Sequence, residues 1–260
     1  MTQNLGSPKE ERARLLDQLR DGGRVTAVVP LTGSRLEEVE QQWAAAAEAG
    51  ADLVEWRLDH LEPSFALSGE ALARFGNAMR SKHGVPVLAT YRTEAEGGGF
   101  AADGASGAAA YRQAVRDTAI WADLVDVELV RPGADDLIEE LKEQTVVVAS
   151  FHNFEPEVDE EFLKETLTVM GESGAGVAKV AWMVADEDDL ETIQDAQRWA
   201  RKTLEVPAAV IGMGELGKDT RLGKSAELSA ISFAMVGAAS APGQPTLGEL
   251  RTSSGEAAPN

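Results

Sequence analysis

The sequence predicts a single-domain (β/α)8 barrel. Short apolar, β-branched runs alternate with longer amphipathic segments along almost the whole chain. This alternation is typical of a parallel sheet that is covered by helices. Eight such units fit within about 230 residues, which is a usual size for a (β/α)8 barrel. An open, doubly wound sheet is the alternative, and no low-complexity linker divides the 260 residues.

The predicted strands are the short apolar runs, taken in chain order. They cover residues 25–31, 53–58, 85–91, 124–129, 145–151, 177–183, 208–213 and 231–237. The predicted helices are the amphipathic segments between these runs. They cover residues 35–49, 69–81, 107–122, 134–143, 158–171 and 187–204, with a further piece after Arg221.

Both ends of the chain fall outside this alternation. We expect residues 1–23 to form a helical extension, residues 24–250 the barrel and catalytic domain, and residues 251–260 a flexible tail. The N-terminal segment lacks the apolar core of a signal peptide, and no run of about 18 apolar residues occurs. The expected protein is therefore cytoplasmic and has no membrane partner.

Composition limits the classes of partner. A net charge of −20 repels nucleic acid phosphates and anionic membranes, although a local arginine cluster can still attract an anionic substrate. The chain has no cysteine, so disulfides and thiol nucleophiles are impossible. Its three histidines form no HExxH pair, and we expect no metal site.

Catalytic groups of such barrels lie at the C-terminal ends of the strands. At the end of the second strand, Glu55, Arg57 and Asp59 alternate onto one face, which is costly unless the charges are paired or used. They form either a structural ion network or a polar rim for a hydroxylated substrate. Arg92 ends the third strand beside a glycine-rich loop, where it is either a substrate contact or a solvated loop residue.

The fifth and sixth strands carry the candidates for chemistry. His152 is a candidate acid/base, with a structural histidine as the alternative. Ser150 shares its face, but no aspartate completes an obvious triad. Lys179 lies inside an apolar run, where burial lowers the pKa of an amine and leaves it free to attack a ketone. The alternative is a lysine whose ammonium group reaches solvent.

A GxGxxG pattern over residues 212–217 follows the seventh predicted strand. Such a pattern can bind a dinucleotide. Only 43 residues follow Gly217, and the next four residues are more typical of a loop than of a helix, so we do not expect a nucleotide cofactor. The Pro-Gly pair at residues 242–243 indicates a turn.

Together these segments resemble the type I 3-dehydroquinate dehydratases of the shikimate pathway, from about residue 25 to residue 250. The motifs that carry the resemblance occur in order: EWRLDH, YRTEAEGG, SFHNF, AKVAWM, GMGELGKDTRLG and SAPGQ. It implies a (β/α)8 barrel, a homodimer, no cofactor, and syn dehydration of 3-dehydroquinate through a lysine Schiff base.

The resemblance also implies a role for individual residues. Lys179 stands at the position of the Schiff-base lysine and His152 at that of the general acid/base, while Glu96 supports the histidine. The residues that match substrate contacts are Glu55, Arg57 and Arg92 toward hydroxyls, and Arg221, Ser240 and Gln244 toward the carboxylate, the last two on a closing loop.

The sequence departs from the family pattern in four places. Pro30 occupies a first-strand position that is often serine, Thr220 replaces a common serine, and Glu227 replaces a common aromatic residue. The final helix is shortened into Gly, Ser and Pro residues. Two other functions stay open: a sensor that binds quinate-like ligands without turnover, and a Schiff-base aldolase that acts on another substrate.

Overall fold

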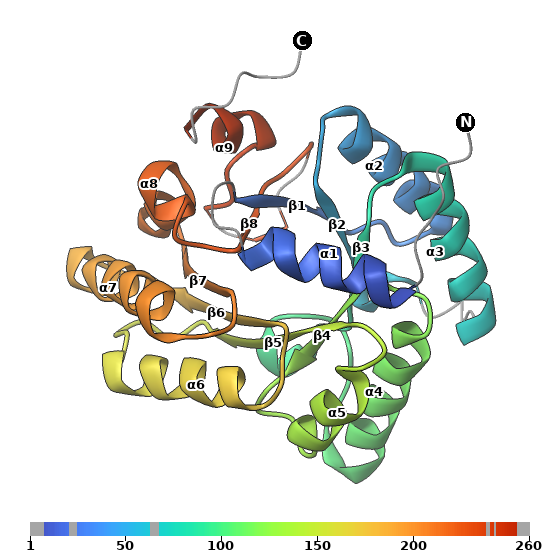
Figure 1. Ribbon diagram of the computed structural model, residues 1–260, viewed down its shortest axis with the longest axis horizontal. Helices are drawn as coiled ribbons and strands as arrows, with labels where there is room; N and C mark the ends of the chain where they lie inside the picture. Colours follow the sequence, from blue (N-terminus) through green and yellow to red (C-terminus); the bar gives the residue numbers. More distant parts are fainter. Residues whose placement is uncertain (1–7, 21–24, 63–67, 238–239, 242, 254–260) are drawn as a thin grey trace.

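The structure is a computed structural model, and it describes residues 8–20, 25–62, 68–237, 240–241 and 243–253. Eight parallel strands alternate with helices and form the nearly closed barrel that the sequence predicts (Figure 1). The strands are β1 Thr26–Leu31, β2 Leu53–Arg57, β3 Val87–Thr90, β4 Leu124–Glu128, β5 Val146–Asn153, β6 Val177–Met183, β7 Ala208–Met213 and β8 Ile231–Phe233.

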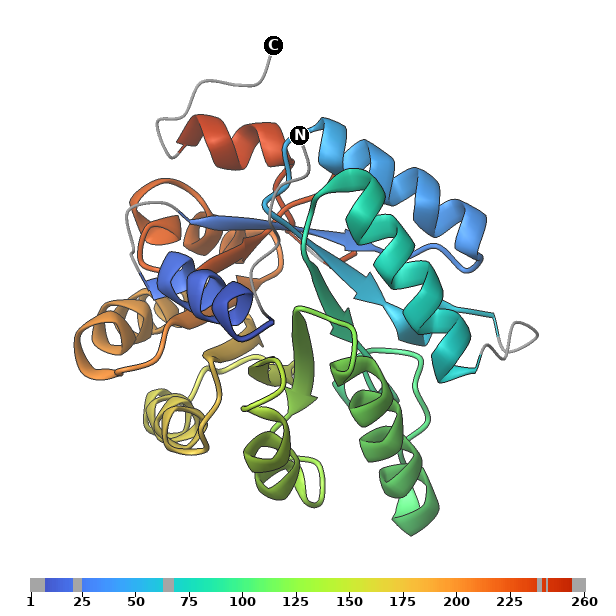
Figure 2. The same ribbon diagram turned by 45° about the vertical axis from the view of Figure 1, so that its right-hand side comes forward.

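The helices surround the strands on the outside of the barrel (Figures 1 and 2). The long ones are α2 Leu36–Glu48, α3 Gly69–His83, α4 Gly104–Ala119, α5 Ala134–Leu141, α6 Glu160–Glu172 and α7 Glu187–Thr203. The shorter ones are α8 Gly223–Ala226, α9 Leu247–Ser253 and the 3-10 helices η1 Leu58–His60, η3 Glu94–Glu96 and η4 Leu216–Arg221.

The hydrogen-bonded order of the strands is β7-β6-β5-β4-β3-β2-β1-β8. Between the two outer strands of this order, the N–H of Ala230 donates to the carbonyl of Ala208 at 2.8 Å. This bond joins the start of β8 to the start of β7. The carboxyl ends of all eight strands therefore meet at one end of the barrel, where a site can draw on every strand.

The inward-facing side chains change in character along the strands. At the strand starts they are apolar, as with Leu53, Leu88 and Leu124, which belong to one buried cluster inside the barrel. Toward the carboxyl ends of β2 to β5 they become polar, for example Asp126 and Glu128 on β4, both at most 1% exposed. Charges in the interior are costly to bury, so this polar layer marks a functional end of the barrel.

Helix α1, Pro8–Arg20, covers the opposite end of the barrel. Leu19 is 2% exposed and belongs to the cluster at the strand starts, and Leu15 and Leu16 pack against that cluster. The N-terminal residues that the sequence predicts to be helical thus include a helix that contributes to the core. At the other terminus α9 extends to Ser253, three residues into the predicted tail, while residues 254–260 lie outside the described part.

Several elements are shorter than the sequence predicts. Strand β8 stops at Phe233 rather than at residue 237, and β3 is confined to Val87–Thr90. The piece after Arg221 forms only the four-residue α8. No helix among the described residues is long and apolar enough to span a membrane.

Candidate active site

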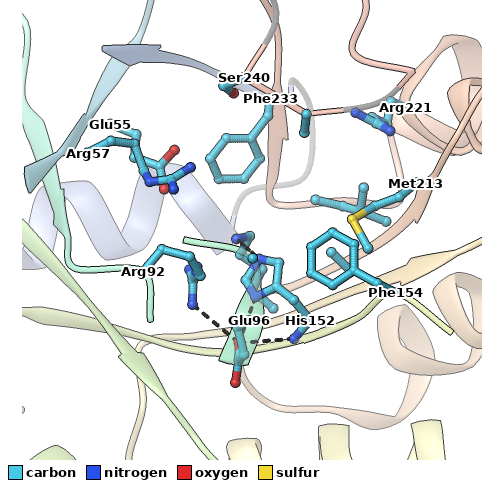
Figure 3. A pocket seen from close by; sticks show the side chains of 15 residues that line it. Glu55, Arg57, Arg92, Glu96, His152, Phe154, Met213, Arg221, Phe233 and Ser240 are labelled. Atoms are coloured by element: carbon cyan, nitrogen blue, oxygen red, sulfur yellow. Dashed lines mark hydrogen bonds and ion pairs between the residues drawn. The ribbon is translucent and has the colours of Figure 1, made fainter. Parts of the chain in front are cut away.

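A pocket opens at the carboxyl ends of the strands, where the sequence analysis places the candidate residues (Figure 3). Every one of the nine candidates except Gln244 lines it. The lining residues are Glu55, Arg57, Arg92, Glu96, Gly97, His152, Phe154, Lys179, Ala181, Ile211, Met213, Arg221, Phe233, Ser240 and Ala241.

Lys179, the candidate nucleophile, is in direct contact with His152 in the wall of the pocket. They lie on adjacent strands, β6 and β5, and Lys179 Nζ is 2.8 Å from His152 Nε2. Burial lowers the pKa of Lys179 to about 8, and the positive charge of Arg92 contributes. Burial also lowers the pKa of His152 well below its usual value, so its ring is neutral at neutral pH. A neutral imidazole beside an amine with a pKa of about 8 can exchange a proton with it.

Glu96 lies behind the histidine, on η3 in the loop that follows β3. Its Oε2 accepts a hydrogen bond from the backbone N–H of His152 at 3.1 Å and lies 2.8 Å from Nδ1 of the same residue (Figure 3). Burial raises the pKa of Glu96 to about 8; Arg92 opposes this rise, and the carboxylates of Glu128 and Asp126 add to it. With Nδ1 held by Glu96, Nε2 is directed toward Lys179.

The loop that carries Glu96 depends on its glycines. Gly97 has a left-handed φ of 79°, which glycine adopts without strain. A Cβ on Gly98 would lie 2.1 Å from the carbonyl oxygen of Arg92. Phe100 N–H donates to that same oxygen at 3.0 Å, so the loop folds tightly against the end of β3.

Arg92 is the centre of a buried ion cluster. Its Nη1 lies 3.0 Å from Glu128 and 3.3 Å from Glu96, and Nη2 lies 2.9 Å from Asp126. Ser150 on β5 accepts from Arg92 Nη1 at 3.0 Å and donates to Asp126 at 2.7 Å. Arg92 also lines the pocket, so its contact with substrate stays a prediction, but the arginine is held by the protein itself.

Sequence reasoning missed the two carboxylates of β4. Asp126 and Glu128 alternate within a predicted strand, and the same signal singled out Glu55 and Arg57 on β2. The carboxylates neutralise Arg92, which would otherwise face the amine of Lys179 as an unpaired like charge.

Glu55 and Arg57 line the pocket from β2. Thr90 Oγ1 donates to Glu55 at 3.0 Å, and Arg57 donates through Nε and Nη2 to both oxygens of Asp59, each at 2.8 Å. Asp59 lies in η1, beyond the end of the strand, and also accepts from Gly99 N–H at 3.1 Å. The Arg57–Asp59 pair is thus a structural ion pair at the edge of the pocket.

Arg221 reaches the pocket from η4. Its Nε and Nη2 donate to the carbonyl of Gly212 at 3.2 and 2.8 Å, and burial lowers its pKa to about 10. The glycine pattern of residues 212–217 serves close packing here: a Cβ on Gly217 would lie 2.4 Å from the carbonyl carbon of Gly212. Thr220 Oγ1 accepts from Gly212 N–H at 2.9 Å and fixes the turn that places Arg221.

Ser240 and Ala241 line the pocket from the segment after β8, whereas Gln244 lies behind them. Gln244 Oε1 accepts from the backbone N–H and the hydroxyl of Ser240 at 2.8 and 3.0 Å. The backbone at Gly243 passes so close to the residue after β7 that an added Cβ would lie 1.9 Å from the carbonyl oxygen of Gly214. Direct contact between Gln244 and a ligand stays a prediction.

The family model described as type I 3-dehydroquinase matches residues 27–254, nearly the whole barrel. The chain belongs to this family. Among the relatives, the 3-dehydroquinate dehydratase of Lactiplantibacillus plantarum is 35% identical over 238 residues, covering 88% of this chain and 90% of the relative. That of Albidiferax ferrireducens is 33% identical over 237 residues, covering 89% and 88%.

Solved structures agree. The 3-dehydroquinate dehydratase of Geobacillus kaustophilus has a TM-score of 0.80 at 28% identity, covering 88% of this chain and 89% of its own. The type I 3-dehydroquinate dehydratase of Clostridium difficile, solved with covalently modified comenic acid, has a TM-score of 0.77 at 26% identity, covering 89% and 91%.

The wall of the pocket is apolar along β6, β7 and β8 and at Phe154, which follows β5. Sequence reasoning did not single out these apolar residues, although Ala181 follows Lys179 by two positions and so shares its face. They are Phe154, Ala181, Ile211, Met213 and Phe233. Among the described residues, no group of three or more His, Asp and Glu side chains is arranged to hold a metal ion.

Proposed function

We propose that the protein dehydrates 3-dehydroquinate to 3-dehydroshikimate through a Schiff base on Lys179, with His152 as the general acid/base. The observation that carries this proposal is the 2.8 Å approach of Lys179 Nζ to His152 Nε2 inside the pocket. Family membership supports the choice of substrate, because the relatives named above are 3-dehydroquinate dehydratases.

The first step joins the lysine to the substrate ketone. The lone pair of the neutral amine forms a C–N bond, and the carbonyl π electrons move to oxygen. The oxygen then leaves as water after it gains two protons, one from Nζ and one from the histidine or solvent. The product is a protonated iminium, whose positive nitrogen withdraws electrons from the neighbouring carbon.

Elimination follows from this electron sink. His152 Nε2 takes the proton from the carbon next to the iminium, the C–H electrons form a C=C bond, and the iminium π electrons move onto nitrogen. The resulting enamine expels the β-hydroxyl, which leaves as water with the proton that His152 carries. Because one imidazole serves both proton transfers, we expect proton and hydroxyl to leave from the same face, in a syn elimination. Hydrolysis of the iminium releases the product and restores the amine.

The two halves of the pocket suggest how the substrate lies. Glu55 and Arg57 on β2, and Arg92 just after β3, are placed to meet its hydroxyls. Arg221 and Ser240, backed by Gln244, are placed to meet its carboxylate, for which arginine is well suited. The apolar side chains of β6 to β8 would then face the C–H surface of the ring. Such positioning lets the ketone carbon approach Nζ.

Borohydride trapping tests the proposal. Borohydride reduces an iminium to a stable amine, so the wild-type protein mixed with 3-dehydroquinate and borohydride should gain the mass of a reduced adduct on Lys179. Lys179→Met, which keeps a similar side-chain volume, should gain none. His152→Ala should still form the adduct but turn over slowly in an assay that follows enone absorbance. Turnover by the wild type without any trapped adduct would overturn the Schiff-base mechanism.

A further inference from the structure

An aromatic ring lies against the proposed nucleophile. The Nζ atom of Lys179 is 4.7 Å from the centroid of the Phe233 ring. Phe233 is the last residue of β8, is 8% exposed, and projects into the pocket (Figure 3). A cation within about 6 Å of a ring centroid is attracted by the negative face of the ring, more strongly where water is excluded.

The charged groups around Nζ lie on other strands. His152 approaches from β5, and Arg92, in the loop after β3, acts against a positive charge at Lys179. Asp126 on β4, Glu55 on β2 and Glu96 on η3 act in its favour. From β8 the neighbour is Phe233, whose ring cannot take up or release a proton. Its effect on a positive nitrogen is therefore the same at every pH.

We propose that Phe233 is a further catalytic residue, whose ring face stabilises the positive iminium nitrogen that forms at Lys179. This inference rests on the Schiff-base function proposed above. The nitrogen is neutral as the attacking amine, positive as the iminium, neutral in the enamine and positive again before product release. A ring beside it favours the two iminium states over the free amine, and so shifts the equilibrium toward the covalent intermediate.

A fluorinated series at position 233 separates this role from simple packing. Phenylalanine, 4-fluoro-, 3,5-difluoro- and 3,4,5-trifluorophenylalanine have nearly the same shape, but each added fluorine makes the ring face less negative. The series is built in the His152→Ala background, where the imine should form but turn over slowly. A brief borohydride quench at pH 9, above the pKa of about 8 at which Lys179 loses its proton, then measures how much imine each 3-dehydroquinate concentration supports.

If Phe233 stabilises the iminium, the 3-dehydroquinate concentration for half-maximal trapping rises with each fluorine, by about 2- to 30-fold over the series. Phe233→Leu should resemble the trifluoro variant. The same series at Phe154, which lines the same pocket, is the matched control and should raise that concentration less than the series at Phe233.

The outcomes separate the two proposals. A flat response at position 233, with normal trapping, overturns the role of the ring and leaves the Schiff base intact. An equal response at positions 233 and 154 also overturns it, because the effect would then come from general polarity of the wall. No adduct in any variant or in the wild type overturns the Schiff-base function itself, and this inference with it.

Discussion

Glu96 holds His152 by two atoms of the same residue: its Oε2 lies 2.8 Å from Nδ1 and 3.1 Å from the backbone nitrogen. The backbone contact fixes the end of β5 and the side-chain contact fixes the rotation of the ring. Together they direct Nε2 toward Lys179. Glu96 is thus a positioning residue, since it acts on the reaction through the histidine.

Removing this support should slow turnover without weakening substrate binding. We predict that Glu96→Ala lowers kcat about 100-fold, within the range that general acid/base catalysis contributes, while KM changes little. Glu96→Gln can still accept both contacts through its amide oxygen and should retain more activity than Glu96→Ala. Steady-state kinetics of both variants check this. Equal kinetics for Glu96→Ala and the wild type would contradict the positioning role, as would equal losses in the two variants.

The lowered pKa of Lys179 predicts the pH dependence of the reaction. An ammonium group cannot attack a ketone, so only the deprotonated lysine is active. With a pKa of about 8, kcat/KM should rise with pH from 6 to 8 and level off above it. Glu96→Gln, whose amide does not titrate, should keep a midpoint near pH 8. A profile that is flat between pH 6 and 9 would show that Lys179 is already deprotonated at neutral pH.

Lys179 should also destabilise the folded protein. Its folded pKa of about 8 lies below the value of 10.5 for a free lysine, so protonation favours the unfolded chain. The penalty is full below pH 8, fades as pH rises toward 10.5, and amounts to about 3 kcal/mol. We predict that Lys179→Met raises the free energy of unfolding at pH 7 and gains less at pH 10. Urea denaturation at both pH values measures this, and a pH-independent difference would contradict it.

How far the sequence predicts the fold depends on the kind of information that each element needs. The apolar runs of β6 and β7 predict those strands to the residue, because burial on both faces requires continuous apolar character. The end of β8 is different. Its register with β1 stops at Val28 and Phe233, and apolar character continues beyond the last paired residue. Which residues of a neighbouring strand pair with β8 is information that lies elsewhere in the chain.

For the site, too, local sequence patterns predict some residues, whereas others depend on contacts between distant parts of the chain. Lys179 and His152 were predictable because Lys179 is a charge inside an apolar run and His152 is a polar residue at the end of one. The partners of Arg92 were not, since Asp126 and Glu128 lie 34 and 36 residues away and only the barrel brings them together. The contact of Gln244 with the carboxylate stays a prediction, and the sequence did not indicate that its side-chain oxygen accepts from Ser240. Sequence patterns do not tell which polar groups bond to each other.

Gly243 lies so close to Gly214 that a larger residue at position 243 should prevent Ser240 from taking its place in the pocket. In Gly243→Ala the added Cβ would meet the Gly214 carbonyl at 1.9 Å, so Ser240 should be displaced from the pocket. We expect kcat/KM to fall about 100-fold, as for a misplaced site residue. Gly237→Ala is the matched control, because Gly237 also has a positive φ but an added Cβ meets nothing within 4 Å. Equal losses in both variants would point to backbone strain instead.

Helix α1 should contribute to stability rather than to turnover. Leu19 is 2% exposed in the cluster at the strand starts, far along the barrel from the pocket. Leu19→Ala should lower the free energy of unfolding by about 2–5 kcal/mol and leave kcat unchanged. Leu216→Ala, at a residue that is 43% exposed, should cost less than about 0.5 kcal/mol. Denaturant unfolding compares the two, and similar small costs would show that α1 is not part of the folded core.

The pocket wall divides between two arcs of the barrel. Strands β2 to β6 and the loop after β3 supply most of the titratable groups, several of which are joined through Arg92. Strands β7 and β8 supply Ile211, Met213 and Phe233, which have no titratable group. A change in the first arc disturbs several charges at once. Substitutions at Ile211 and Met213 can reshape the cavity while the proton-transfer groups keep their places. Directed evolution toward altered ring substrates would therefore start from β7.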